Sequence, residues 1–60
     1  MTTHIPTDPA ILLSYVNTQL RNHYPTFDEL CASMNLDQAQ ITQKLESIGY
    51  VYNSSKNQFQ

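Results

Sequence analysis

Apolar residues recur at helical spacing in three stretches of the chain. The first stretch opens at Asp8-Pro9, where aspartate suits the N-cap and proline suits the first helical position. It ends before Pro25, because the residue that precedes a proline avoids the helical conformation. The apolar face of this helix contains Leu12, Leu13, Val16 and Leu20, widened by Ile11 and Tyr15. The opposite face contains Ser14, Asn17, Thr18 and Arg21.

Two shorter helices follow, and each opens with a capping box. Thr26 and Asp37 each supply a side-chain acceptor, with Glu29 or Gln40 three residues later. Asn35 is expected to end the second helix in the left-handed conformation, which asparagine tolerates. The residue after it, Leu36, is expected to enter the core from the turn. The inner faces contain Phe27, Leu30, Cys31 and Met34 in the second helix, and Ile41, Leu45 and Ile48 in the third.

A β-hairpin is expected at the C-terminus. Gly49 is a helix stop, residues 50–52 alternate like a strand, and residues 53–57 have the composition of a turn. Phe59 can close a second, very short strand. In such a strand Tyr50 and Tyr52 share one face and Val51 takes the other. Either Val51 packs inward and both tyrosines are exposed, or the tyrosines pack inward and Val51 is exposed.

The predicted fold is therefore mainly α, with three short helices in a helix-turn-helix arrangement and a C-terminal two-stranded hairpin. With 60 residues the chain forms one domain, over residues 8–60, preceded by a flexible arm at residues 1–7. The formal charge of −2 arises from five acidic residues against Arg21, Lys44 and Lys56. This balance disfavours a non-specific grip on phosphates or on an anionic membrane.

Catalytic and metal-binding patterns are not found in the sequence. His4 and His23 have no partner at metal-ligand spacing, and the single Cys31 indicates a buried reduced thiol. The chain shows no signal peptide, and its longest apolar run is too short to span a bilayer. We therefore expect a cytoplasmic protein that is not an enzyme, that holds no cofactor or metal, and that acts by binding.

Residues 41–50 resemble the recognition helix and wing entry of winged-helix domains. Apolar residues at Ile41, Leu45 and Ile48 are followed by Gly49 and a hydrophobic strand, the order found in that family. This resemblance implies a winged-helix-like fold and possible DNA binding. The chain departs from the family pattern in its short third helix and in a wing turn whose single cation is Lys56.

A second resemblance covers almost the whole chain. The blocks DPAILLSYVNTQLR and KLESIGYVY, the Leu30-Cys31 pair and the run from Asn57 to Phe59 are similar to a small bacterial family known as domain of unknown function 4250. That resemblance implies a short, stand-alone bacterial protein. It implies no activity, cofactor or catalytic residue.

Two functions from different classes fit these observations. The first is protein interaction, including self-association as a homodimer, with Tyr50, Tyr52 and Phe59 as candidate contacts, because tyrosine buries a large area at low entropic cost. The second is a DNA-binding transcriptional regulator that acts as a dimer through its third helix, since Gln can pair with adenine and Ala or Thr can touch a thymine methyl group. Its candidate contacts are Gln38, Ala39, Thr42, Gln43, Lys44 and Lys56. The low positive charge favours protein interaction.

Overall fold

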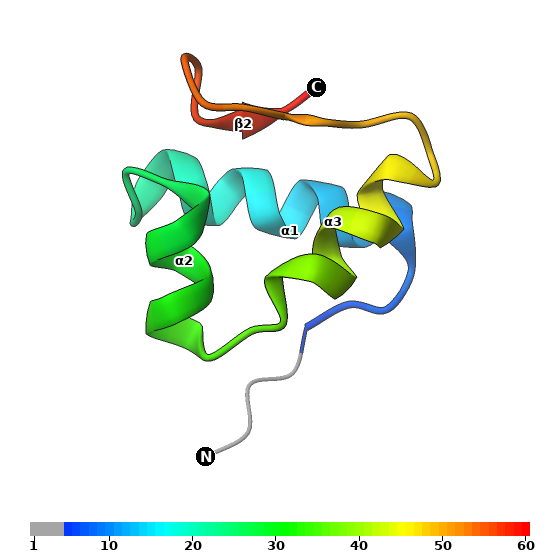
Figure 1. Ribbon diagram of the computed structural model, residues 1–60, viewed down its shortest axis with the longest axis horizontal. Helices are drawn as coiled ribbons and strands as arrows, with labels where there is room; N and C mark the ends of the chain where they lie inside the picture. The colour runs from blue at the N-terminus through cyan, green and yellow to red at the C-terminus, as the bar shows by residue number, and fades with distance from the viewer. Residues whose placement is uncertain (1–4) are drawn as a thin grey trace.

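The structure of the chain is a computed structural model that describes residues 5–60, and it confirms three helices followed by an antiparallel hairpin (Figure 1). The elements are α1 (Pro9–Asn22), α2 (Phe27–Met34), α3 (Gln38–Glu46), β1 (Tyr52–Asn53) and β2 (Gln58–Phe59). Residues 5–7 form no helix or strand, although Ile5 packs against the core. The greater part of the expected N-terminal arm, with His4, lies outside the described residues.

Two of the three expected N-caps form the predicted hydrogen bonds. Thr26 Oγ1 accepts the Glu29 backbone N–H at 3.1 Å, and Asp37 Oδ1 accepts the Gln40 N–H at 3.2 Å. Asp8 occupies the N-cap of α1, but its side chain makes no capping hydrogen bond. The start of α1 therefore relies on Pro9, whose fixed φ angle suits the first turn of a helix.

The turns that end α2 and α3 use left-handed backbone conformations. Asn35 has φ 55° and ψ 49°, as predicted, and the Leu36 N–H then donates to the Cys31 carbonyl at 2.9 Å. This turn directs the half-buried Leu36 against the core. Gly49 has φ 88° with no other atoms near the position of a Cβ, so a glycine is favoured there by backbone conformation and not by lack of space.

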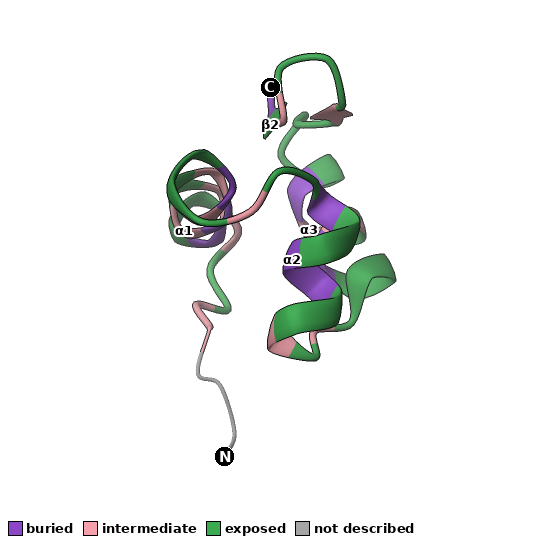
Figure 2. Cartoon of the chain, turned by 90° about the vertical axis from the view of Figure 1, so that its left-hand side faces the viewer, coloured by how far each residue is buried: buried purple, intermediate pink, exposed green. Residues whose placement is uncertain are grey.

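One hydrophobic core joins all three helices to the second strand of the hairpin. The buried row of α1 faces the buried sides of α2 and α3 (Figure 2). Phe59, near the end of the chain, completes this core with 2% of its surface exposed. The buried residues are Leu12, Val16, Leu20, Phe27, Leu30, Cys31, Ile41, Leu45 and Phe59.

Two residues predicted to face the core are exposed instead. Ile11 is 57% exposed because it lies about 140° around the helix from Val16, the middle of the buried row. Ile48 is 40% exposed because α3 ends at Glu46, two residues before it, so the helical spacing no longer places it on the buried face. The spacing of Ile41 and Leu45 predicted their burial correctly, but it could not fix where the helix stops.

The hairpin places Tyr52 against the core and leaves Val51 in solvent. Tyr52 pairs with Phe59, and Val51 exchanges both backbone hydrogen bonds with Gln60 at 3.0 Å. Val51 is 57% exposed and Tyr50 is 37% exposed, so neither of the two arrangements left open by the sequence forms in full: Tyr52 packs inward, and Tyr50 does not. The rings of Phe27, Tyr52 and Phe59 form a cluster with centroid separations of 4.9–5.5 Å, and this cluster packs the hairpin onto the start of α2.

The Cys31 thiol is part of this core. Its burial raises the pKa of the thiol, and the carboxylates of Asp28 and Asp37 raise the pKa further. The folded chain therefore holds this proton to a higher pH than the unfolded chain. Because the folded state then binds more protons, stability falls as the pH rises through that window.

We predict that the wild-type chain loses more stability between about pH 7 and pH 10 than the Cys31→Ala variant, which lacks the thiol. Below the ordinary thiol pKa, the thiol is protonated in both the folded and the unfolded chain. The stability of wild type and that of Cys31→Ala should therefore change equally with pH in that range. Urea unfolding of both chains over a pH series measures the difference. Equal losses up to pH 10 would contradict the assignment.

Candidate functional site

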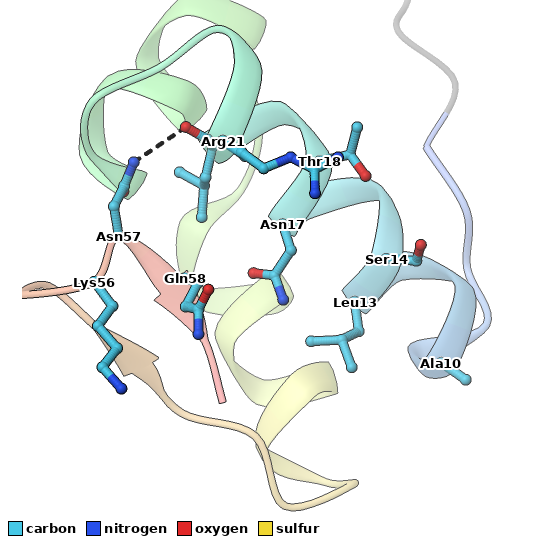
Figure 3. A pocket seen from close by; sticks show the side chains of 10 residues that line it. Ala10, Leu13, Ser14, Asn17, Thr18, Arg21, Lys56, Asn57 and Gln58 are labelled. Carbon is cyan, nitrogen blue, oxygen red and sulfur yellow. Dashed lines mark hydrogen bonds between the residues drawn. The ribbon is translucent and has the colours of Figure 1, made fainter.

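A groove lies between α1 and the turn and second strand of the hairpin (Figure 3). Its volume is about 650 Å³, and it is the larger of the two hollows considered below. Side chains from α1 form one wall, and residues 56–58 form the other. The lining residues are Ala10, Leu13, Ser14, Asn17, Thr18, Leu20, Arg21, Lys56, Asn57 and Gln58.

Asn17 attaches β2 to the middle of α1. Because Val51 and Gln60 exchange hydrogen bonds, the next pair, Tyr52 and Phe59, directs its backbone groups away from the partner strand. The Asn17 side chain meets both outward groups of Phe59. Its Oδ1 accepts the Phe59 N–H at 2.8 Å, and its Nδ2 donates to the Phe59 carbonyl at 3.1 Å. One amide side chain thus occupies the place of a third strand.

Asn57 attaches the hairpin turn to the end of α1. Its Nδ2 donates to the Leu20 carbonyl at 3.1 Å and to the Tyr24 carbonyl at 2.9 Å. Leu20 belongs to the last turn of α1, where carbonyls have no partner within the helix. Asn57 holds this position with φ 53°, a left-handed conformation that asparagine tolerates better than most residues.

The Tyr52 hydroxyl extends this network to the start of α2. It donates to Asn57 Oδ1 at 2.8 Å and accepts the backbone N–H of Phe27 at 3.2 Å. Phe27 opens α2, so its N–H also lacks a partner within the helix. Asn57 and Tyr52 therefore connect the last turn of α1 with the first turn of α2.

Neither asparagine was identified from the sequence as a structural residue. The sequence places Asn17 on the polar face of the first helix and Asn57 in a turn. The hydrogen-bond partners of Asn17 lie 42 residues away, so no local pattern carries a signal for them. The one local signal for Asn57 is that asparagine in a tight turn often adopts a positive φ.

The groove is positively charged, whereas the chain as a whole is negatively charged. Arg21 and Lys56 line it, and these are two of the three cationic residues. None of the five acidic residues lines it. A positive groove therefore lies on a chain whose net charge is −2.

The candidate DNA contacts do not form one surface. Ala39 and Gln43 are exposed on α3, and Thr42 and Lys44 are half-buried there. The side chain of Gln38 donates to Asp28 Oδ1 at 2.7 Å, so it is engaged within the protein. Lys56 lies instead in the groove beside α1 (Figure 3).

The three candidate protein contacts differ in how far they are exposed. Phe59 is buried, so a partner cannot reach its ring while the fold is intact. Tyr52 is half-buried, with its hydroxyl engaged by Phe27 and Asn57. Tyr50 alone of the three is exposed, at 37%. Val51, which is not among the candidate contacts named from the sequence, is also exposed, at 57%.

Within residues 5–60, no group of three or more His, Cys, Asp or Glu side chains could hold a metal ion. His23 is exposed after α1, and Cys31 is buried, so the structure does not present these two as a reactive pair. In the same part of the chain, each helix is too short or too polar to cross a membrane.

Residues 6–59 match the family described as Domain of unknown function (DUF4250). Comparison with curated proteins and with solved structures gave no match. Because the family match covers nearly the whole chain, the chain belongs to this family, as its sequence blocks indicated. The family description names no activity, so any function must be argued from the surfaces described above.

We predict that Asn17→Ala destabilises the fold by about 1–3 kcal/mol, because both outward backbone groups of Phe59 lose their partner. Asn17→Asp should also destabilise, since a carboxylate oxygen then faces the Phe59 carbonyl. Urea unfolding measures both variants. The matched control is Thr18→Ala on the adjacent exposed position of α1, expected within about 0.5 kcal/mol of wild type. An Asn17→Ala chain as stable as this control would contradict the attachment.

We predict that Tyr52→Phe costs about 1–2 kcal/mol, because it keeps the ring and removes the hydroxyl that joins Asn57 to Phe27. The backbone N–H of Phe27 should then exchange with solvent faster, as followed by amide hydrogen exchange. Tyr50→Phe makes the same chemical change at an exposed position and serves as the control. Unchanged exchange at Phe27 would rule out the connection.

Proposed function

Starting from membership in the DUF4250 family, we propose that this chain is a non-catalytic protein-interaction module that pairs with a second copy of itself through the outer edge of β1. The observation that carries the proposal is an uncovered strand edge beside an exposed, uncharged apolar segment. The partner in this proposal is an identical chain, so that the assembly is a homodimer.

The two edges of the hairpin differ in whether their backbone groups have hydrogen-bond partners. Asn17 occupies the edge of β2 at Phe59. On β1, the N–H and carbonyl of Tyr52 point away from β2, and none of residues 5–60 supplies a hydrogen-bond partner to them. Figure 2 shows β1 on the side of the hairpin away from α1. An uncovered edge of this kind pairs readily with a strand from another chain.

The segment that leads into β1 is apolar and exposed. Ile48, Tyr50 and Val51 are 40%, 37% and 57% exposed. A shallow hollow of about 380 Å³ lies against the strand, lined by Val51, Tyr52, Asn53, Ser54 and Gln60. Strand addition at this edge would cover apolar side chains together with backbone groups.

The absence of charge around this edge supports a second copy as the partner. Residues 47–55 contain no charged side chain, although the chain as a whole has a charge of −2. Two copies can therefore bring this segment together without like charges facing each other. A strongly acidic or basic partner would gain nothing from these contacts.

The expected dimer is weak. An interface of standard size covers about 800 Å² on each partner. That area is about a fifth of the 4026 Å² surface of this chain, more than a few residues around a short strand can supply. We therefore expect a dissociation constant on the order of 100 μM, and a mass that changes with concentration.

DNA binding through α3 is our second candidate, supported by the exposed Ala39 and Gln43. Its charges weaken it, because Asp28 and Glu29 open α2 and Asp37 caps α3, so the helix starts that could bind phosphate carry acidic residues. Binding to mixed DNA fragments that disappears when Lys44 is changed to glutamate, and that falls steeply with salt, would favour this candidate over self-association.

We predict that Val51→Lys abolishes the concentration-dependent increase in mass, because an exposed lysine on an edge strand opposes pairing with a second strand. Light scattering after size exclusion, over a series from about 10 μM to 1 mM, measures the mass. Wild type should approach the dimer mass at the upper end, and the variant should remain a monomer throughout.

The matched control is Ile11→Lys, which places the same side chain at a position that is also 57% exposed, but on α1. It should dimerise as wild type does. If wild type is a monomer over the whole series, or if both lysine variants behave alike, self-association through β1 is wrong.

A further inference from the structure

We propose that the groove between α1 and the hairpin binds a short acidic peptide segment of a partner protein. Its walls are separate from the exposed edge of β1, so this inference adds a second binding surface to the proposed function. The occupant is an extended peptide with two acidic side chains and an apolar residue at one end.

The charges of the groove call for an anionic ligand. Arg21 and Lys56 supply two positive charges, and the five acidic residues lie outside the lining. Carboxylates of a ligand would meet attraction here and repulsion over much of the remaining surface. The Leu20 carbonyl, at the end of α1, already accepts a hydrogen bond from Asn57. This carbonyl is therefore not a free acceptor that would repel an anionic ligand.

The arrangement of the two cations favours two separated acidic groups over one compact anion. Figure 3 shows Arg21 on the helix wall, where its side chain extends along α1 toward Thr18. Lys56 extends from the hairpin wall in a different direction. Two carboxylates on neighbouring parts of a peptide can each meet one of these cations.

The length and lining of the groove suit an extended peptide. Ala10 and Arg21 lie eleven residues apart on α1, a rise of about 16 Å, which matches about five residues of extended chain. Leu13 and Ala10 form an apolar end, and the polar side chains of Ser14, Thr18 and Gln58 can bond to peptide groups. Among residues 5–60, no aromatic side chain lines the groove, so this part of the chain offers no stacking platform of the kind that single-stranded nucleic acids use.

The walls are held in place by hydrogen bonds that do not involve the two cations of the groove. Asn17 fixes β2 to α1, and Asn57 fixes the turn to the end of α1. Arg21 and Lys56 are exposed, so both can be changed without removing these attachments.

The test uses the intact chain and two fluorescent pentapeptides. The first has a leucine at one end and two glutamates, and the second has two glutamines in place of the glutamates. Fluorescence anisotropy at low salt measures affinity, and amide chemical shifts locate the site. We expect binding of the glutamate peptide alone, with shifts along α1 and residues 56–58. Arg21→Gln and Lys56→Gln should each weaken it about two- to fivefold, and added salt should weaken it too.

The matched control is Lys44→Gln, which removes the third cation from α3, outside the groove. It should bind the glutamate peptide as wild type does. Equal binding of both peptides, an equal loss in Lys44→Gln, or no binding at millimolar peptide would overturn the proposal. A single-stranded oligonucleotide that binds more tightly than the peptide through Arg21 and Lys56 would also overturn it. None of these results bears on the mass series that tests the β1 dimer.

Discussion

The amide of Asn57 forms hydrogen bonds that join three parts of the fold. Through the Leu20 and Tyr24 carbonyls and the Tyr52 hydroxyl, it joins the end of α1, the hairpin turn and the start of α2. Two strands of two residues each cannot form a stable hairpin alone. The hairpin must therefore be attached to the helices, and this attachment places the Phe59 ring in the core.

That placement matters because a chain of 60 residues has a small core. Phe59 is one of the nine residues that are buried within residues 5–60, and it packs edge-on against Phe27 with centroids 4.9 Å apart. The polar attachments and the aromatic cluster act on the same strand from two sides. Asn17 orders the backbone of β2, and the cluster buries its side chain. Phe59 is therefore held in place both through its backbone and through its ring.

The same attachments determine which surfaces remain for partners. Asn17 covers the edge of β2, so β1 is left as the edge that can accept another strand. Asn17 and Asn57 also hold the helix and the hairpin at the separation that forms the cationic groove. Both proposed binding surfaces are consequences of how the hairpin is docked, and they lie on different residues of it.

The sequence predicted the parts of this fold that depend on local signals. The caps at Thr26 and Asp37 and the left-handed Asn35 are each specified by a few neighbouring residues. The periodicity identified the buried rows. It failed at Ile11 and Ile48, because the width of a buried face and the last turn of a helix are set by what packs against them.

The groove could not be predicted from the sequence, because it too depends on how distant segments pack together. Arg21 and Lys56 are 35 positions apart, and only the docking of the hairpin brings them to one groove. The residues responsible for that docking look like ordinary polar residues in the sequence. Asn17 has the composition of a solvated helix face, and Asn57 has that of a solvated turn. Their role is visible only once the distant backbone groups that they bind are in place.

Position 57 nevertheless has a narrow chemical requirement. The residue must tolerate φ 53°, donate to two carbonyls and accept from a hydroxyl. Glycine meets the first condition and neither of the others, and aspartate can accept but cannot donate. Glutamine carries the same amide on a longer side chain and is less tolerant of the left-handed conformation. Asparagine alone satisfies all three, so this one residue fixes both the backbone of the turn and the position of the helices that it joins.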